Sequence, residues 1–176
     1  MTSNVHETSP SLLAVAAAQP DWQVVFAEQL PRVYNYFRYR LGHETLAEDL
    51  TSRTFEKAWV ERRRYRRDLA GFATWLLRIA HNVAIDHFRT SHQHERLEEA
   101  ADAQADGTPE DEAQTRSNFA RLSALISALP ARERELLALK YGAGATNRAI
   151  ADVTGLSESN VGTILHRTVQ TLRSNW

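Results

Sequence analysis

The sequence contains no cysteine and only one methionine among its 176 residues. Without cysteine the chain can form no disulfide framework and no thiolate metal site, so nothing in it points to an oxidising compartment. The apolar run from Leu12 to Ala18 lacks a basic start and is too short to cross a bilayer. We therefore expect a cytoplasmic protein without membrane insertion, which begins with a flexible N-terminal tail over residues 1–21.

Alternation of apolar and polar residues, the pattern of half-buried strands, is absent over any useful length. Apolar residues instead recur every three or four positions, as in amphipathic helices, so we expect an all-α fold. The first half predicts helices over residues 26–41, 44–61 and 72–89, with Pro31 kinking or restarting the first helix and Gly42 ending it. The last third predicts helices over 119–129 and 132–141, one after Thr146, and one over 158–173.

The chain carries almost no net charge, with 21 basic and 22 acidic residues, but the balance is uneven. Residues 1–90 hold 12 Lys and Arg against 10 Asp and Glu, residues 91–118 hold 2 against 8, and residues 119–176 hold 7 against 4. This distribution predicts two small, mildly basic helical domains, residues 22–90 and 119–176. The acidic linker between them, residues 91–118, is expected to be flexible or partly helical, and a passive tether is its plainest role.

A basic segment separates the second and third predicted helices. It places five guanidinium groups within six residues around one aromatic ring: Arg62, Arg63, Arg64, Tyr65, Arg66 and Arg67. Such charges repel one another unless anions approach, and the Tyr ring offers a surface on which a base can stack. Trp75 follows shortly afterwards, and surfaces of this composition hold unstacked single-stranded bases. The segment indicates nucleic-acid binding; the alternatives are a solvated basic face and a core role for Trp75.

The last third contains the pattern of a helix-turn-helix. Thr146 and Ser157 are each placed to cap a helix, and Glu158 stands in the first turn of the second helix, where the helix dipole favours a carboxylate. On a helical wheel one side of this helix is apolar, and the polar residues on or beside the other side are Ser159, Asn160, Thr163, His166, Arg167 and Gln170. This polar face suits the reading of base edges and phosphates in a major groove; the alternative is an exposed helix side.

Two stretches of the first half, Ala47 to Trp59 (AEDLTSRTFEKAW) and Gly71 to Asp86 (GFATWLLRIAHNVAID), resemble region two of the extracytoplasmic-function class of bacterial sigma factors, within the sigma-70 family. In the last third, Leu129 to Glu135 (LPARERE), the helix-turn-helix and Leu165 to Arg167 (LHR) resemble region four of the same class. The two motifs stand in the family's order and spacing. Together the resemblance covers about residues 22–90 and 119–173.

The resemblance implies an initiation subunit that binds bacterial core RNA polymerase and promoter DNA, and it leaves room for an anti-sigma factor as a third partner. Region two would dock on the polymerase through Asp49, Leu50, Phe55 and Trp59, although Leu50 and Phe55 fit a structural role equally well. The family's minus-ten positions match the basic segment Arg62 to Arg67, beside which Trp75 is placed by its residue type alone, and Arg78, Asn82, Asp86 and Arg89. For Asp86 the alternative is to orient its basic neighbours. Its minus-thirty-five positions match Ser157, Glu158, Ser159, Asn160, Thr163, His166, Arg167 and Gln170.

The chain departs from the family's pattern in two places. Ser52 and Arg53 stand where relatives often carry Gln and Glu, which alters the polar details expected of polymerase docking. The stretch after Arg167 is less basic than in many relatives, which implies weaker phosphate anchoring and a factor that needs the polymerase to bind promoters. The acidic linker lies where relatives thread a connector toward the polymerase's nucleic-acid channels, so it is either a strand mimic or a passive tether.

Two other classes of function are open on the sequence alone. A stand-alone helix-turn-helix regulator would fit the last sixty residues, but nothing in the rest of the chain resembles a ligand-sensing domain. An enzyme would draw on His81, His87, His92 and His94, since imidazoles near carboxylates can bind zinc. These histidines form no ligand set at fixed helical spacing with a general base. We therefore expect no enzymatic activity, no cofactor and no metal.

Overall fold

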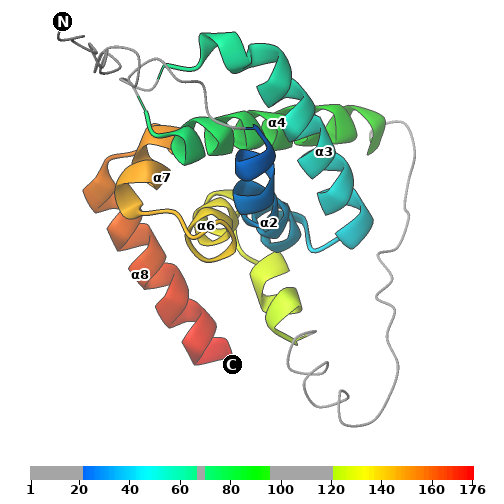
Figure 1. The fold of residues 1–176 in the computed structure, drawn as a ribbon. Helices are drawn as coiled ribbons and strands as arrows, with labels where there is room; N and C mark the ends of the chain where they lie inside the picture. Colours follow the sequence, from blue (N-terminus) through cyan, green and yellow to red (C-terminus); the bar gives the residue numbers. More distant parts are fainter. Residues whose placement is uncertain (1–21, 67–69, 96–120) are drawn as a thin grey trace, which may run out of the picture.

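The computed structural model describes residues 22–66, 70–95 and 121–176, and within these ranges it contains helices and no strand, which confirms the all-α prediction. The predicted N-terminal tail, Arg67 and most of the predicted linker lie outside the described residues. No helix in the described ranges is long and apolar enough to span a membrane. In chain order the elements are α2 (Trp22–Leu41), α3 (Glu44–Glu61), the 3-10 helix η1 (Arg62–Arg64), α4 (Phe72–Glu95), a helical segment at 121–127, α6 (Ala131–Leu137), the π-helical η2 (Ala138–Gly142), α7 (Asn147–Thr154) and α8 (Glu158–Asn175) (Figure 1).

Helices α2, α3 and α4 pack around a shared apolar core. Leu50, Thr54 and Ala58 recur every four residues along α3 and are fully buried, so they form the stripe that faces the other two helices. The Thr54 hydroxyl donates to the Leu50 carbonyl at 2.7 Å, so its burial leaves no donor unsatisfied. Phe37 of α2 and Leu76 of α4 are fully buried in the same core.

The ends of these helices confirm one prediction and correct another, and at Pro31 the restart, one of the two predicted outcomes, does not occur. Gly42 ends α2 in the left-handed conformation, with φ at 74°. Pro31 does not begin a new helix, since α2 continues through it. Packing on both sides of the exposed proline holds the helix together, because Phe26 stacks on Phe55 of α3 and Phe37 is buried. Helix α4 runs to Glu95 rather than Arg89, because residues 90–95 contain neither Gly nor Pro to stop it.

Helices α6, η2, α7 and α8 build the second half, with Leu136, Leu139, Ile150 and Val161 fully buried between them. The sequence predicted one helix over residues 132–141. The chain instead passes from α6 into a π-helical turn, in which the Ala143 amide donates to a carbonyl five residues earlier at 3.0 Å. The inward face was therefore predicted correctly, and the wider turn was not, because π turns have no strong local signal.

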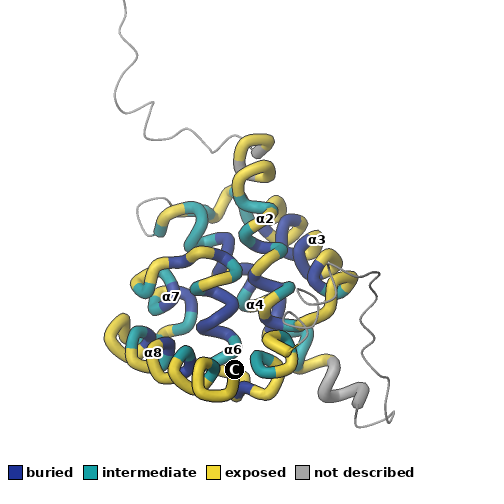
Figure 2. The backbone as a smooth tube through the Cα atoms, turned by 90° about the horizontal axis from the view of Figure 1, so that it is seen from below, coloured by how far each residue is buried: buried dark blue, intermediate teal, exposed yellow. Residues whose placement is uncertain are grey.

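The two halves lie against each other, so the buried residues form one cluster that crosses both (Figures 1 and 2). Helix α2 packs on η2 and α6, while α4 packs on α7. The sequence predicted two domains and a linker, and it contained no indication of this contact. The seam between the halves, formed by α2 and α4 on one side and α6, η2 and α7 on the other, is called the inter-domain seam below.

Candidate nucleic-acid and partner interfaces

The helix-turn-helix is built as the sequence predicted. Thr146 Oγ1 accepts a hydrogen bond from the backbone N–H three residues on at 3.1 Å, and Ser157 Oγ does the same at 3.2 Å. These bonds satisfy amides that a helix start leaves open. Gly155 ends α7 with φ at 75°, a conformation that other residues rarely adopt. Two caps and one glycine thus set the path of the chain from α7 into α8.

Helix α8 buries one face and exposes the other. Val161, Leu165 and Thr168 are buried against the rest of the second half. The Thr163 hydroxyl donates to the Ser159 carbonyl at 3.0 Å, which leaves its oxygen lone pairs and its methyl group facing solvent. The predicted minus-thirty-five residues are all exposed: Ser157, Glu158, Ser159, Asn160, Thr163, His166, Arg167 and Gln170. The structure therefore brings this set together on one accessible surface.

A hollow of about 280 Å³ lies beside this face, and it was not identified from the sequence. Lys140 of η2 and Arg173 of α8 line it together with His166 and Gln170. Lys140 Nζ donates to Asn147 Oδ1 at 2.9 Å, which holds the ammonium group close to the start of α7. Cationic groups at the edge of a recognition helix suit phosphate contacts. The sequence alone could not show that Lys140 and Arg173 line one hollow, because they belong to different helices.

The basic segment between α3 and α4 is ordered around a cluster of three aromatic rings. Tyr65, Phe72 and Trp75 are half-buried, and their ring centroids lie 5.2 to 5.3 Å apart. The Arg62 guanidinium lies 3.9 Å from the ring centroid of Trp59, and its Nη1 donates to the Trp59 carbonyl at 2.5 Å. The exposed cations of the segment, among the residues the structure describes, are Arg63, Arg64 and Arg66. Tyr65 and Trp75 therefore present a joint aromatic surface rather than two separate rings.

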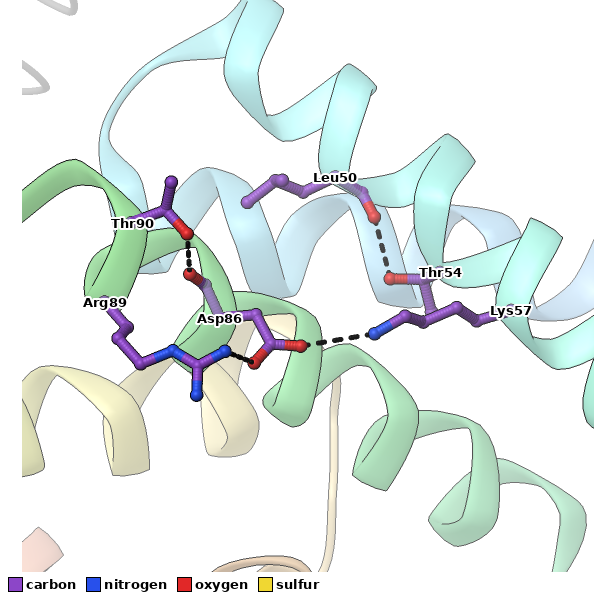
Figure 3. A network of polar contacts seen from close by, with 6 residues as sticks. All are labelled: Leu50, Thr54, Lys57, Asp86, Arg89 and Thr90. Carbon is purple, nitrogen blue, oxygen red and sulfur yellow. Dashed lines mark hydrogen bonds and ion pairs between the residues drawn. The ribbon is translucent and has the colours of Figure 1, made fainter. Parts of the chain in front are cut away.

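Helix α4 carries the other predicted minus-ten residues on one exposed stripe, since Arg78, Asn82, Asp86 and Arg89 follow each other at three- and four-residue spacing. Asp86 lies at the centre of a small network, in which its two carboxylate oxygens accept from Lys57 Nζ of α3 and from Arg89, each at 3.3 Å (Figure 3). All three side chains are about half or more exposed, so these pairs add little stability. They place the Lys57 ammonium group beside the stripe, next to Arg89 within it.

An apolar groove opens between α2 and α3. It encloses about 790 Å³ and is lined by Phe26, Phe55 and Trp59, with Glu56 and Ser52 at its polar edge. Phe26 is 48% exposed and Trp59 is 50% exposed, which is unusual for such large apolar side chains. The sequence assigned Phe26 only to the buried stripe of its helix. An exposed, concave apolar surface of this kind is typical of a protein-binding site.

The four predicted polymerase-docking residues separate into two groups. Asp49 is exposed and pairs with Arg53 at 3.0 Å, so the arginine at this atypical position neutralises the carboxylate beside it. Trp59 is half-exposed, and Phe55, although 6% exposed, forms part of the groove wall. Leu50 is fully buried and cannot touch a docked protein in this fold, so the structural alternative applies to it.

The predicted alternatives based on histidine gain no support. Among the described residues no group of three or more His, Cys, Asp or Glu side chains could hold a metal ion. His81 contacts the buried carboxylate of Glu135 at 2.8 Å, and burial together with the neighbouring Arg53 lowers the pKa of His87. The side chains of His92 and His94 lie outside the described part of the chain.

Comparisons with known families agree with this arrangement. Residues 25–93 match the family model of sigma-70 region 2, and residues 119–172 match that of sigma-70 region 4. The chain belongs to the sigma-70 family, in its extracytoplasmic-function class. The two matches contain the α2–α3 groove and the α4 stripe in region two, and the helix-turn-helix in region four.

Named relatives of this sigma class share the pattern over most of the chain. The extracytoplasmic-function RNA polymerase sigma factor BldN of Streptomyces coelicolor is 36% identical over 146 residues, which is 80% of this chain and 54% of BldN. The probable RNA polymerase sigma factor RfaY of Xanthomonas campestris pv. campestris is 36% identical over 136 residues, 73% of this chain and 33% of RfaY. The chain thus spans about half and one third of these two relatives. SigM of Bacillus subtilis is 26% identical over 81% of this chain and 86% of its own length.

Solved structures of sigma factors share the fold. The sigma factor RpoE, in complex with the anti-sigma factor NepR from Bartonella quintana, superposes with a TM-score of 0.70 at 19% identity, covering 88% of this chain and 96% of RpoE. CnrH, in complex with the cytosolic domain of CnrY, superposes with a TM-score of 0.66 at 22% identity, covering 92% of this chain and 91% of CnrH. At these identities the likeness establishes the fold.

Proposed function

We propose that the protein is an alternative sigma factor that binds bacterial core RNA polymerase and directs promoter-specific initiation of transcription in the cytoplasm. The observation that carries the proposal is the presence of both family regions, in order, on a chain with separate partner-binding and DNA-binding surfaces. Region two would supply the protein-binding groove and the basic, aromatic strand-binding surface. Region four would supply the exposed polar face of α8. In this role the protein is an initiation factor and not an enzyme.

We assign polymerase docking to the groove between α2 and α3, with Phe26 and Trp59 as its apolar contacts and Asp49 at its side. Covering two half-exposed aromatic rings removes apolar surface from water, which is the main source of affinity in protein interfaces. The Asp49–Arg53 pair is exposed and close to the groove, so it can adjust to a partner's charges. An anti-sigma factor would compete for this same surface; RpoE, which shares the fold, was solved in complex with the anti-sigma factor NepR.

Minus-ten binding is assigned to the cluster of Tyr65, Phe72 and Trp75, the exposed arginines beside it, and the α4 stripe. Extruding a base from the duplex costs a few kcal/mol, which stacking on an aromatic surface and contacts to phosphates can offset. The arginines lie on the chain segment next to the rings, so the bases of one strand could stack on the rings while the arginines neutralise its phosphates. Minus-thirty-five recognition is assigned to Asn160, Thr163 and their exposed neighbours on α8.

Reconstituted transcription tests the proposal. Purified protein and bacterial core polymerase are incubated with a library of promoter fragments, and the transcripts are sequenced. We expect initiation at a defined set of promoters that requires both components. A stand-alone regulator would instead bind duplex DNA tightly without polymerase and yield no polymerase-dependent transcript, and that outcome would overturn the assignment.

A further inference from the structure

The inter-domain seam is crossed by hydrogen bonds from the region-two side chains to the region-four backbone. Arg32 Nε of α2 donates to the Ala143 carbonyl at 2.8 Å, and Arg78 of α4 donates to the Asp152 carbonyl at 2.9 Å. Gly142 approaches α2 so closely that a Cβ there would lie 2.7 Å from the Asn35 carbonyl oxygen. The seam is therefore a close, specific contact.

A buried carboxylate lies at the centre of the seam. Glu135 of α6 is 7% exposed, and its two oxygens meet three groups from region two: the Tyr36 hydroxyl at 2.7 Å, His81 Nδ1 at 2.8 Å, and the Arg40 guanidinium. Burial alone would raise the pKa of Glu135, but the hydrogen bond with His81, the charge of Arg40 and the hydrogen bond from Tyr36 together hold it below its ordinary value. The buried carboxylate keeps its charge because region two supplies its partners, and it has these partners only while the halves touch.

The closed arrangement is too short to occupy a promoter. The minus-ten and minus-thirty-five elements are about 25 base pairs apart, or about 85 Å at 3.4 Å per base pair. A compact chain of this length has a radius of gyration of about 16 Å, hence a width of about 40 Å. The closed form also engages Arg78, one of the residues assigned to the minus-ten strand. Both DNA elements can be contacted together only after the seam has opened.

We propose that the Glu135 cluster is a clasp that keeps the free sigma factor closed and that must open before the polymerase-bound factor contacts both promoter elements. The proposal rests on the function proposed above. The clasp consists of Glu135 with Tyr36, Arg40 and His81, and its region-two partners come from both α2 and α4. Closing therefore fixes region four against two helices of region two, and the free energy of closing is subtracted from the free energy of promoter binding by the polymerase complex.

Two features indicate that the seam is able to open. Arg134 Nε is buried without a hydrogen-bond partner, and burial together with the nearby charge of Arg40 lowers the pKa of Arg134, so the closed state carries an electrostatic cost. A cavity of about 230 Å³ borders Glu135, His81 and Arg132, which is room enough for water to reach the clasp. A contact that is partly unsatisfied and open to water is suited to exchange with an external partner.

The test measures the distance between the halves in the full-length free protein. Because the chain has no cysteine, cysteines introduced at the exposed residues Thr45 of α3 and Ser174 of α8 carry the only spin or fluorescent labels. Wild type should give one short, narrow distance distribution. Two variants should lengthen and broaden it: Gly142→Ala, whose added methyl group pushes against the α2 backbone, and Glu135→Gln, which leaves Arg40 without its counter-charge.

The same variants, each bound to core polymerase, are then titrated with a duplex promoter fragment that carries both elements. If closing competes with contact at both elements, each variant should bind the fragment about tenfold more tightly or better, because a larger fraction of the protein is already open. Matched controls are Gly162→Ala, whose added methyl group meets only the end of a side chain at 3.5 Å, and Glu133→Gln, which removes a charge from the same helix. Both controls should keep wild-type distances and affinity. Circular dichroism checks that every variant keeps its helicity.

The outcomes separate the clasp from the function. A wild-type distribution that is already long and broad, or variants that open without a gain in promoter affinity of their polymerase complexes, would overturn the clasp. If neither wild type nor any variant binds polymerase, while the distances change as expected, the proposed function is overturned instead. Should Gly142→Ala or Glu135→Gln lose helicity, Tyr36→Phe takes its place, because it removes one hydrogen bond of the clasp, keeps the ring and leaves region four unchanged. Wild-type distance and affinity in Tyr36→Phe would then refute the clasp.

Discussion

Replacing Trp59 by alanine tests the docking groove most directly. A Trp side chain buries up to about 200 Å² in a protein interface, and Trp59 is 50% exposed, so a partner that covers it removes about 100 Å² from water. At about 25 cal/mol per Å² the lost contact amounts to about 2.5 kcal/mol, which corresponds to a loss of affinity on the order of 50-fold. Some fold stability is lost as well, since Arg62 stacks on this ring, and about 0.5–1 kcal/mol is expected for such an exposed pair.

The assay is fluorescence anisotropy of labelled protein titrated with core polymerase. Val60→Ala is the matched control, because Val60 is 76% exposed on the same helix and does not line the groove. Phe26→Ala should weaken polymerase binding to a similar degree, because Phe26 lines the same groove from the α2 side and is 48% exposed. If Trp59→Ala and Phe26→Ala bind polymerase like Val60→Ala while keeping their helicity, the groove is not the docking surface.

Three further predictions concern DNA binding and stability. Tyr65→Ala should slow promoter opening on duplex DNA and recover on a template with a pre-melted minus-ten region, as followed by permanganate reactivity of thymines; normal opening on duplex DNA would show that the ring is not used. Thr163→Ala should change the preferred minus-thirty-five sequence, at a cost of about 1–3 kcal/mol of binding free energy at one base pair. Arg167→Ala should weaken binding to all sequences and reduce the salt dependence of binding. Equal effects of both variants in promoter titrations would remove the base-reading assignment. Because the pKa of Glu135 is lower in the folded state, its ionised form stabilises the fold at pH values above the ordinary Glu pKa of about 4.3. This stability is lost as the pH falls through the lower folded pKa. Urea midpoints of wild type should therefore fall more steeply below pH 4 than those of Glu135→Gln.

Local features of the fold could be read from the sequence because each has a local cause. A Thr or Ser hydroxyl three residues before a free amide caps a helix wherever the chain turns, and Thr146 and Ser157 both do so. Gly42 ends α2 for an equally local reason. The exposed face of α8 could be predicted because its apolar residues recur at helical spacing and form one buried stripe, which leaves the opposite side in solvent. At Pro31 the predicted restart does not occur, and Phe26 on its N-terminal side packs against Phe55 of α3.

Features that join distant segments had no such signal. Glu135 stands in the run Arg-Glu-Arg-Glu, which is typical of a solvated first helical turn, yet its carboxylate is buried. Its partners Tyr36 and Arg40 are 99 and 95 residues away in sequence, and each could equally have faced water. The groove at Phe26 was missed for a related reason. Periodicity shows that a side chain lies on the apolar face, but only the packed neighbours decide whether it is covered.

The closed arrangement also bears on why the free protein should bind duplex promoters weakly. The seam covers none of the α8 reading face, since Asn160, Thr163 and Arg167 are exposed while the halves touch. Occlusion therefore cannot account for weak binding by region four, and opening the clasp should not improve it. The reason is charge, because residues 119–176 hold only 7 Lys and Arg against 4 Asp and Glu, and affinity for duplex DNA rises with each phosphate neutralised. On the proposed function, the polymerase strengthens binding by holding the two opened halves at the spacing of the two promoter elements, so that contact at one raises the effective concentration at the other.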